Sequence, residues 1–206
     1  MQKIVVLGAS HATRIYNALL RHEKAKDFEI IKYTRPGASL GASSKNVEIN
    51  KSVFSNLNER DIVLVQYTGN DLLEKRIEIS KNPKNIHITD FKPKSDSYVQ
   101  KARKRLEDIL SLTSAKVIII DDVYRHIRCC DKHLFPGLVS YLSKRNKELQ
   151  KQFSKKYIVL DHRTLLKEKF YKIRNLRFYK TLLEDSVHLK PIFYDQIVDS
   201  LFEKMF

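Results

Sequence analysis

Short apolar runs alternate with longer amphipathic stretches along this chain. Five apolar runs have the length of strands: residues 3–7, 28–33, 61–67, 116–121 and 157–160. Five stretches between or after them repeat apolar residues every three to four positions, the period of a helix with one buried face: residues 10–22, 98–112, 137–154, 165–183 and 191–206. Residues 74–97 are polar and contain two prolines, which predicts an irregular loop or a mobile lid.

Strands separated by helices of crossover length predict a mostly parallel sheet, because parallel neighbours need such a connection. Helices on both faces of this sheet would bury the apolar strands. The expected fold is therefore α/β, a three-layer α/β/α sandwich of the flavodoxin-like kind around a five-stranded sheet. No internal repeat or linker divides the sequence, so we expect one domain over residues 1–206.

The composition is that of a globular protein, with 42% hydrophobic residues in 206. No apolar run approaches the ~20 residues of a membrane span, and residues 1–7 lack the longer apolar region of a signal peptide. Cys129 and Cys130 are adjacent, a spacing that rarely suits a disulfide. These features predict a cytoplasmic protein without a membrane span.

The charge is the unusual feature of the composition. Thirty-nine Lys and Arg residues against 24 Asp and Glu residues leave a net charge of +15. Such an excess favours a polyanionic partner: nucleic acid, an acidic membrane surface or an anionic substrate. A surface that only keeps the protein soluble would carry the same charge.

Small and polar residues follow the first three apolar runs directly, as Gly8–His11, Arg35–Gly37 and Thr68–Asp71. In a parallel α/β sheet, ligands bind beyond the carboxyl ends of the strands, where these segments would meet. Ser10 would begin a helix, whose free backbone N–H groups favour negative charge. A serine in this position is, however, most often a simple helix cap.

Four sequence blocks resemble, in order, the signature blocks of the SGNH/GDSL hydrolases: Gly8-Ala9-Ser10-His11, Gly37, Gly69-Asn70-Asp71 and Asp185-Ser186-Val187-His188-Leu189. The resemblance runs nearly from end to end, and Asn146 on a helix after the fourth strand also fits it. Two positions depart from the commonest pattern: Ala9 stands where the family usually has Asp, and Thr68 where it usually has Gly. Neither change removes a reacting group.

The resemblance implies a serine esterase or deacylase that hydrolyses small acyl (acetyl-type) esters without a metal or cofactor. It assigns Ser10 as the nucleophile, His188 as the general base and Asp185 as the group that orients His188. It also assigns an oxyanion hole to the backbone N–H groups of Ser10 and Gly37 together with the amide of Asn70. A serine hydroxyl needs such a neighbouring imidazole before it can attack a carbonyl group.

Other polar residues have less specific patterns. Asp121 and Asp122 resemble a metal-binding carboxylate pair but favour an acidic turn at a strand end. A loop that contains ligand-type side chains has no recognised zinc spacing: His126, Cys129, Cys130 and His133. His11 would contact substrate or only pack beside the first helix.

Two further residues near strand ends are weaker candidates for the reaction. His162 follows the fifth apolar run, but its neighbour Asp161 lacks the three-residue spacing of a triad pair. Asp71 would act in catalysis or, more in keeping with the family's pattern, brace its loop.

One run of basic residues is interleaved with aromatic residues and is the candidate nucleic-acid surface: Arg163, Lys167, Lys169, Lys172, Arg174, Arg177 and Lys180. Cations grip phosphates, and aromatic rings stack on bases. The aromatic residues favour the alternative, an amphipathic helix whose rings enter the core. The second functional hypothesis is accordingly a non-catalytic SGNH-like scaffold that binds RNA, as in the C-terminal domain of the insect germ-plasm protein Oskar or retrotransposon esterase domains.

Overall fold

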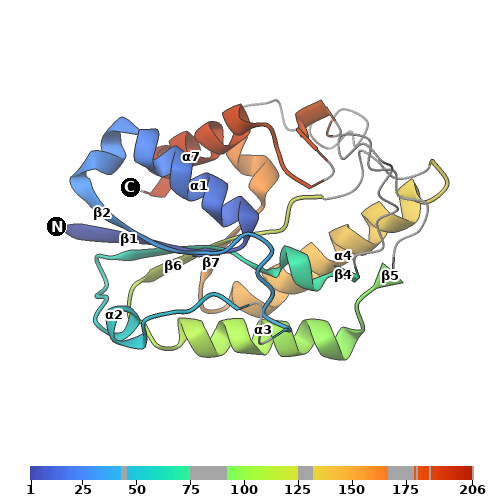
Figure 1. The fold of residues 1–206 in the computed structure, drawn as a ribbon, viewed down its shortest axis with the longest axis horizontal. Helices are drawn as coiled ribbons and strands as arrows, with labels where there is room; N and C mark the ends of the chain where they lie inside the picture. Colours follow the sequence, from blue (N-terminus) through green and yellow to red (C-terminus); the bar gives the residue numbers. More distant parts are fainter. Residues whose placement is uncertain are drawn as a thin grey trace.

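A five-stranded parallel sheet lies at the centre of the computed structural model, in the order β2-β1-β3-β6-β7 (Figure 1). The structure describes residues 1–42, 46–74, 92–124, 132–166, 179, 181–185 and 187–205. The central strands are β1 (Gln2–Gly8), β2 (Phe28–Thr34), β3 (Ile62–Gln66), β6 (Lys116–Ile120) and β7 (Ile158–Leu160). The five strands and the α/β class predicted from the sequence are confirmed.

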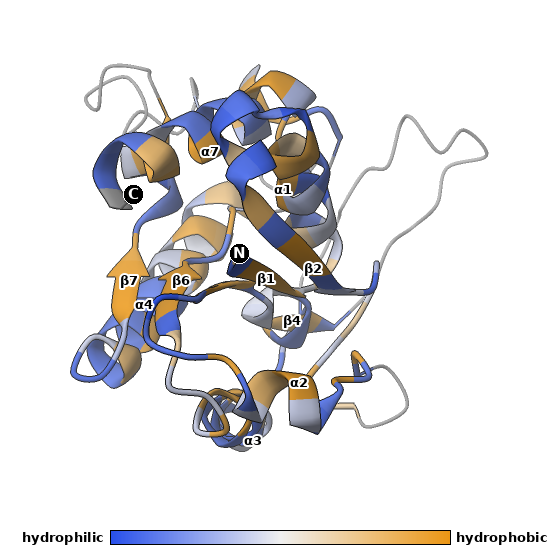
Figure 2. Ribbon diagram, turned by 90° about the vertical axis from the view of Figure 1, so that its left-hand side faces the viewer, coloured by the Kyte–Doolittle hydropathy of each residue, from blue (hydrophilic) through white to orange (hydrophobic). Residues whose placement is uncertain are grey.

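Helices cover both faces of the sheet. The helices are α1 (Ser10–Arg21), α2 (Lys51–Ser55), α3 (Asp96–Leu110), α4 (Phe135–Phe153) and α7 (Pro191–Met205). Figure 1 shows α1 and α7 on one face and α2 and α3 on the other. Leu138 and Leu142 of α4 pack into the core beside α1 and α7, whereas Leu149 and Phe153 of the same helix pack beside α3. The strands supply the centre of both core layers, as the hydrophobic colouring of β6 and β7 in Figure 2 illustrates.

Short elements complete the described chain. Three 3₁₀ turns are η1 (Glu23–Asp27), η3 (Thr68–Asp71) and η5 (His162–Leu165), and two short strands pair antiparallel, β4 (Leu73–Glu74) with β5 (Lys92–Pro93). The loop predicted at residues 74–97 therefore contains strand β5 and the first turn of α3, while residues 75–91 lie outside the described residues. No helix in the described part of the chain has both the length and the apolar character to cross a bilayer.

One short helix was not predicted, and one predicted helix does not start at the expected residue. The short helix α2 was not predicted; Asn50 begins it by accepting hydrogen bonds from the backbone N–H groups of Ser52 and Val53 at 3.1 and 3.4 Å. The helix predicted to start at Leu165 does not start there, because η5 ends at that residue and Leu166 has extended backbone. The apolar spacing that suggested a helix instead places Leu165 in the core. Residues 167–178 of that prediction lie outside the described residues.

The crossing from β1 to α1 requires glycine. Gly8 has a φ of +152°, and a Cβ atom there would lie 2.0 Å from the carbonyl oxygen of Gln66 on β3. This close approach lets the chain turn sharply at the carboxyl end of β1. Ser10 consequently begins α1 at the edge of the sheet where the other parallel strands also end.

Candidate active site

Ser10, His188 and Asp185 form a hydrogen-bonded chain at the carboxyl edge of the sheet. The Oγ atom of Ser10 lies 2.9 Å from Nε2 of His188, although the two residues are 178 positions apart in the sequence. The other ring nitrogen of His188, Nδ1, lies 2.8 Å from Oδ2 of Asp185. This geometry would let Nε2 of the imidazole accept the serine proton while the carboxylate accepts a hydrogen bond from Nδ1–H on the other side of the ring.

The turn that carries Asp185 and His188 is stabilised by the side chain of Asp185 and by the residues on either side of the turn. Oδ1 of Asp185 accepts hydrogen bonds from the backbone N–H groups of Val187 and His188 at 2.6 and 2.7 Å, the pattern of an Asx turn. The buried side chains of Leu183 and Leu189 flank the turn, and their backbones form a bridge. The spacing Asp-x-x-His thus brings the two side chains together through contacts within four residues.

The environment favours an ionised Asp185. Partial burial raises the pKa of this carboxyl, but the hydrogen bonds from the His188 side chain and from the backbone N–H groups of His188 and Val187 outweigh it. The net pKa of Asp185 lies below its usual range. A negative charge at this position stabilises the imidazolium that forms when His188 takes a proton.

The turn around Gly37 lies next to the segment that carries Ser10. The backbone N–H of Arg35 donates to the carbonyl oxygen of Gly8 at 3.1 Å, and Gly37 has a φ of +75°, which favours glycine. Asn70 of η3 donates from Nδ2 to the carbonyl oxygen of Ala38 at 2.7 Å. The structure therefore places Asn70 against the Gly37 turn, with one amide proton used to hold that turn; their roles as oxyanion donors stay a prediction.

The side chain of Asp71 holds the residues that follow the Gly37 turn. Its carboxylate is fully buried and accepts hydrogen bonds from the hydroxyl of Ser39 at 2.5 Å and from the backbone N–H groups of Leu40 and Gly41 at 2.9 and 2.8 Å. A Cβ atom on Gly41 would lie 2.2 Å from the ring of Tyr98 on α3. These contacts fix the loop beside Ser10 and leave the carboxylate of Asp71 engaged with it.

The two departures from the family pattern have structural partners. Thr68 is buried and donates from Oγ1 to Oδ2 of Asp122 at 2.6 Å. Asp122 also accepts a hydrogen bond from Gln66, and its backbone carbonyl accepts one from the Asn146 side chain of α4. Asp122 therefore joins the ends of β3 and β6 to α4, as expected for an acidic turn. Ala9 is buried, and its N–H donates to the carbonyl oxygen of Gln66 at 3.2 Å.

Tyr194 is a neighbour of the site that sequence reasoning missed. Its hydroxyl lies 2.6 Å from Nδ1 of His11 and accepts a hydrogen bond from the backbone N–H of Leu189 at 3.3 Å. The buried ring of His11 lies 5.1 Å from the ring of His188. Tyr194 of α7 thus connects α1 to the turn that carries His188. The only signal for it in the sequence was its place on the inner face of the closing helix.

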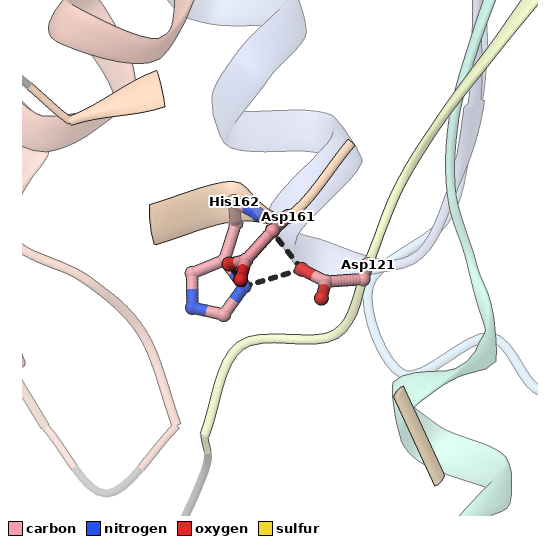
Figure 3. A group of neighbouring side chains, drawn as sticks. All are labelled: Asp121, Asp161 and His162. Atoms are coloured by element: carbon pink, nitrogen blue, oxygen red, sulfur yellow. Dashed lines mark hydrogen bonds and ion pairs between the residues drawn. The ribbon is translucent and has the colours of Figure 1, made fainter. Parts of the chain in front are cut away.

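A second cluster of ligand-type side chains lies directly after the carboxyl ends of β6 and β7 (Figure 3). Asp121, Asp161 and His162 bring oxygen and nitrogen atoms within 4.8 Å of one another. Each is already engaged: Nδ1 of His162 lies 2.5 Å from Oδ1 of Asp121, and the carboxylate of Asp161 holds the Arg163 guanidinium at 2.5–3.1 Å. These three residues could hold a metal ion only by giving up those bonds, so their arrangement favours a structural role.

The other nitrogen of the buried His162 binds a phenol. Nε2 of His162 lies 2.8 Å from the hydroxyl of Tyr179, which accepts a hydrogen bond from the backbone N–H of Tyr124 at 3.4 Å. Burial raises the pKa of Tyr179 well above its usual value. The phenol therefore stays protonated and donates to His162, whose Nδ1–H donates to Asp121. This chain joins β6, β7 and the segment that precedes Asp185.

The predicted nucleic-acid surface falls mostly outside the described residues. Lys167, Lys169, Lys172, Arg174, Arg177 and Lys180 lie outside the described residues, as do His126, Cys129 and Cys130. Arg163 is described, and its charge is compensated by Asp161 while its guanidinium lies 5.2 Å from the Tyr124 ring centre. The ring of Tyr179 is buried in the core, as expected of the aromatic residues in this run. His133 is exposed just before α4.

No protein-family model and no curated protein matches the chain. Solved structures do. A member of the lipolytic G-D-S-L family from Veillonella parvula has a TM-score of 0.63 at 15% identity, covering 100% of this chain and 98% of that one. A protein from Slackia heliotrinireducens assigned as an SGNH hydrolase has a TM-score of 0.58 at 15% identity, covering 100% and 99%. A GDSL-like lipase from Bacteroides thetaiotaomicron has a TM-score of 0.54 at 12% identity, covering 98% and 86%.

These structures are similar over nearly the whole of this chain, and their sequences are distant from it. A likeness of this kind establishes how the chain is folded. The chain has the α/β fold of the SGNH/GDSL hydrolases.

Proposed function

We propose that this protein is a serine ester hydrolase that cleaves small acyl esters of the acetyl type. Ser10 would act as the nucleophile, His188 as the general base and acid, and Asp185 as the group that orients and charges His188. One observation carries the proposal: Oγ of Ser10 lies within hydrogen-bond distance of the imidazole that Asp185 holds from behind. The names of the similar structures, lipolytic G-D-S-L protein and GDSL-like lipase, describe the same class of chemistry in those proteins.

The first half of the reaction would acylate the serine. Oγ of Ser10 attacks the ester carbonyl carbon while its proton passes to Nε2 of His188. The carbonyl oxygen becomes an oxyanion beside the first turn of α1, where backbone N–H groups and the helix dipole favour negative charge. When the tetrahedral intermediate collapses, the C–O bond to the alcohol breaks and His188 returns the proton to the leaving alkoxide.

The second half would release the acid. Water gives a proton to His188 and attacks the acyl carbon. His188 then returns this proton to Oγ of Ser10 as the acyl–serine bond breaks and the acid is released. The expected oxyanion donors are the backbone N–H groups of Ser10 and Gly37 and the side-chain amide of Asn70. The bracing of the Gly37 turn by Asn70 and Asp71 supports this expectation, because a preorganised donor stabilises an oxyanion better than a mobile one.

The test compares wild type with Ser10→Ala. Purified wild type should hydrolyse p-nitrophenyl acetate and should be labelled once by a fluorophosphonate probe, whereas Ser10→Ala should lose both. Ser140→Ala, at an exposed serine of α4, is the matched control and should keep both. Equal, negligible turnover of wild type and Ser10→Ala across a panel of short-chain esters, with no labelling, would refute the proposal.

A further inference from the structure

Helix α4 presents a row of lysines to solvent. Lys144, Lys147 and Lys151 are exposed and spaced three and four residues apart, so they share one face of the helix. The distance along the axis from Lys144 to Lys151 is about 10 Å. The exposed Lys155 and Lys156 extend the row into the turn after the helix. We call these five residues the α4 lysine face.

Most of this positive charge is not cancelled locally. Lys144 lies 3.9 Å from the carboxylate of Glu148, which also binds Arg145. Among the residues that the structure describes, the other four lysines of the face form no ion pair. Lysines elsewhere on the surface do, for example Lys26 with Glu23 and Lys104 with Asp108. The face therefore keeps a positive potential that attracts anions.

Two hollows adjoin the α4 lysine face. One, of about 400 Å³, lies between α3 and α4 and is lined by Gln100, Arg103, Lys151 and Lys155, with Glu148 and Gln152. The other, of about 490 Å³, lies where β6 and β7 begin, and its lining includes Lys116, Lys155, Lys156 and Tyr157. Lys155 lines both, so the two hollows are adjacent.

Each hollow is lined by a residue with an unused, buried polar atom. Arg103 is 1% exposed; it donates to the carbonyl oxygen of Arg145 at 2.8 Å and to Glu148 at 3.4 Å, and its Nε atom has no hydrogen-bond partner among the described residues. The hydroxyl of Tyr157 is likewise buried without a partner in the described part of the chain, and Nζ of Lys156 lies 5.4 Å from the centre of the Tyr157 ring. A buried donor without an acceptor costs free energy, so a small movement of these side chains toward an oxygen-rich ligand in the hollows would be favoured.

We propose that the α4 lysine face and its two hollows bind the sugar–phosphate backbone of a single-stranded polynucleotide. The row of lysines, about 10 Å long from Lys144 to Lys151 alone, is longer than a single small anion could contact. The hollows have the volume of small-ligand sites, which admits the nucleotides of a flexible strand rather than a rigid duplex. Glutamine and hydroxyl side chains in the lining suit phosphate and sugar oxygens, so recognition would not depend on base sequence.

The same surface is a poor match to a membrane. Among the described residues, the well-exposed large apolar side chains are Met1, Leu20, Leu112 and Ile192, and none of them lies on α4. A membrane-binding helix would place apolar side chains next to its lysines. The site is also separate from Ser10, because the second hollow lies at the edge where β6 and β7 begin, opposite to the edge where β1 ends. Binding here is independent of the proposed hydrolase activity.

The test measures fluorescence anisotropy of a labelled 20-nucleotide poly-U RNA at several salt concentrations. The triple variant Lys147→Gln, Lys151→Gln, Lys155→Gln should bind roughly tenfold or more weakly at 0.1 M salt, and the slope of log K against log salt should shrink by about 2. The control variant Lys24→Gln, Lys32→Gln, Lys51→Gln removes the same charge from exposed lysines on other elements and should change the affinity less than about threefold.

Three results would overturn the proposal: no RNA binding by wild type, equal losses in the two triple variants, or binding only to phosphatidylserine vesicles. Photo-crosslinking of the poly-U RNA to wild type gives a second reading that does not depend on a variant. Cross-linked peptides should map to residues 144–157, and cross-links confined to other segments would contradict the assignment.

Discussion

The chains Asp185–His188–Ser10 and Asp121–His162–Tyr179 have the same order of groups: a carboxylate, an imidazole and a hydroxyl. In the first, the two hydrogen bonds measure 2.8 and 2.9 Å, and in the second 2.5 and 2.8 Å. Both use Nδ1 of histidine toward the carboxylate and Nε2 toward the hydroxyl. By hydrogen-bond pattern alone, the two would be equally good candidates for a reacting site.

Burial and the kind of hydroxyl separate them. His162 and Tyr179 are fully buried and Asp121 is 1% exposed, so no substrate reaches that chain. The His188 side chain is 20% exposed and that of Asp185 47%, at the edge of the sheet. The buried phenol stays protonated, whereas Ser10 lies at the start of a helix with its hydroxyl against Nε2 of the partly exposed His188. The same bonding pattern thus serves architecture in one place and suits nucleophilic chemistry in the other.

The sharpest test of this contrast exchanges the two histidines for alanine in separate variants. His188→Ala should lower kcat for p-nitrophenyl acetate by about 10⁵–10⁶-fold with little change in the unfolding midpoint, because it removes the proposed base from a partly exposed position. His162→Ala should instead lower the free energy of unfolding by about 3–5 kcal/mol, since it leaves the buried Asp121 carboxylate and Tyr179 hydroxyl without their imidazole partner. Activity assays and urea denaturation measure both; the reverse assignment would sink the comparison.

The two carboxylates should differ in the same way as the two histidines. Substitution of Asp185 should lower activity, substitution of Asp121 should lower stability, and each loss should be smaller than that of the corresponding histidine variant. Asp185→Asn should reduce kcat by about 10³–10⁴-fold while the fold persists, because an amide cannot stabilise the imidazolium. Asp121→Asn should leave kcat within a few-fold and lower the unfolding midpoint in circular dichroism melts. A large loss of kcat in Asp121→Asn, with its melting curve unchanged, would show that the buried chain takes part in the reaction.

The pH dependence of stability offers a weaker but cleaner signal. The folded pKa of Asp185 is lowered, so the charged form stabilises the native state above the ordinary carboxyl pKa of about 3.9, and this contribution is lost as pH falls below it toward the folded pKa. The difference in free energy of unfolding between wild type and Asp185→Asn should shrink as the pH falls from 5 to 3. A difference that does not change over this range would argue against an ionised Asp185.

The smallest effect is expected at the rim of the site. Arg14 of α1 donates to Glu184, the neighbour of Asp185, at 2.7 Å, and both side chains are well solvated. Arg14→Gln should change the unfolding midpoint hardly at all and kcat by less than about threefold, since exposed ion pairs contribute little. A loss of kcat comparable to that of Asp185→Asn would mean that Arg14 helps to place the turn.

Local patterns in the sequence determined the five strands, four of the helices and the pairing of Asp185 with His188. These features depend on residues close in sequence: apolar runs, helical spacing and an Asx turn built within four residues. The small and polar residues after the strands could also be assigned to one edge, since parallel strands end together.

Contacts between distant segments were decided by the tertiary structure alone. Spacing argued against His162, yet the fold gives it Asp121 and Tyr179, residues 41 and 17 positions away, as partners. The basic run at residues 163–180 could be identified from the sequence. The hollows beside the α4 lysine face could not, because they form only where α3, β6 and β7 meet the end of α4. A sequence records which residues are neighbours along the chain; packing and burial, which set access and the cost of an unpaired group, exist only once the segments have come together.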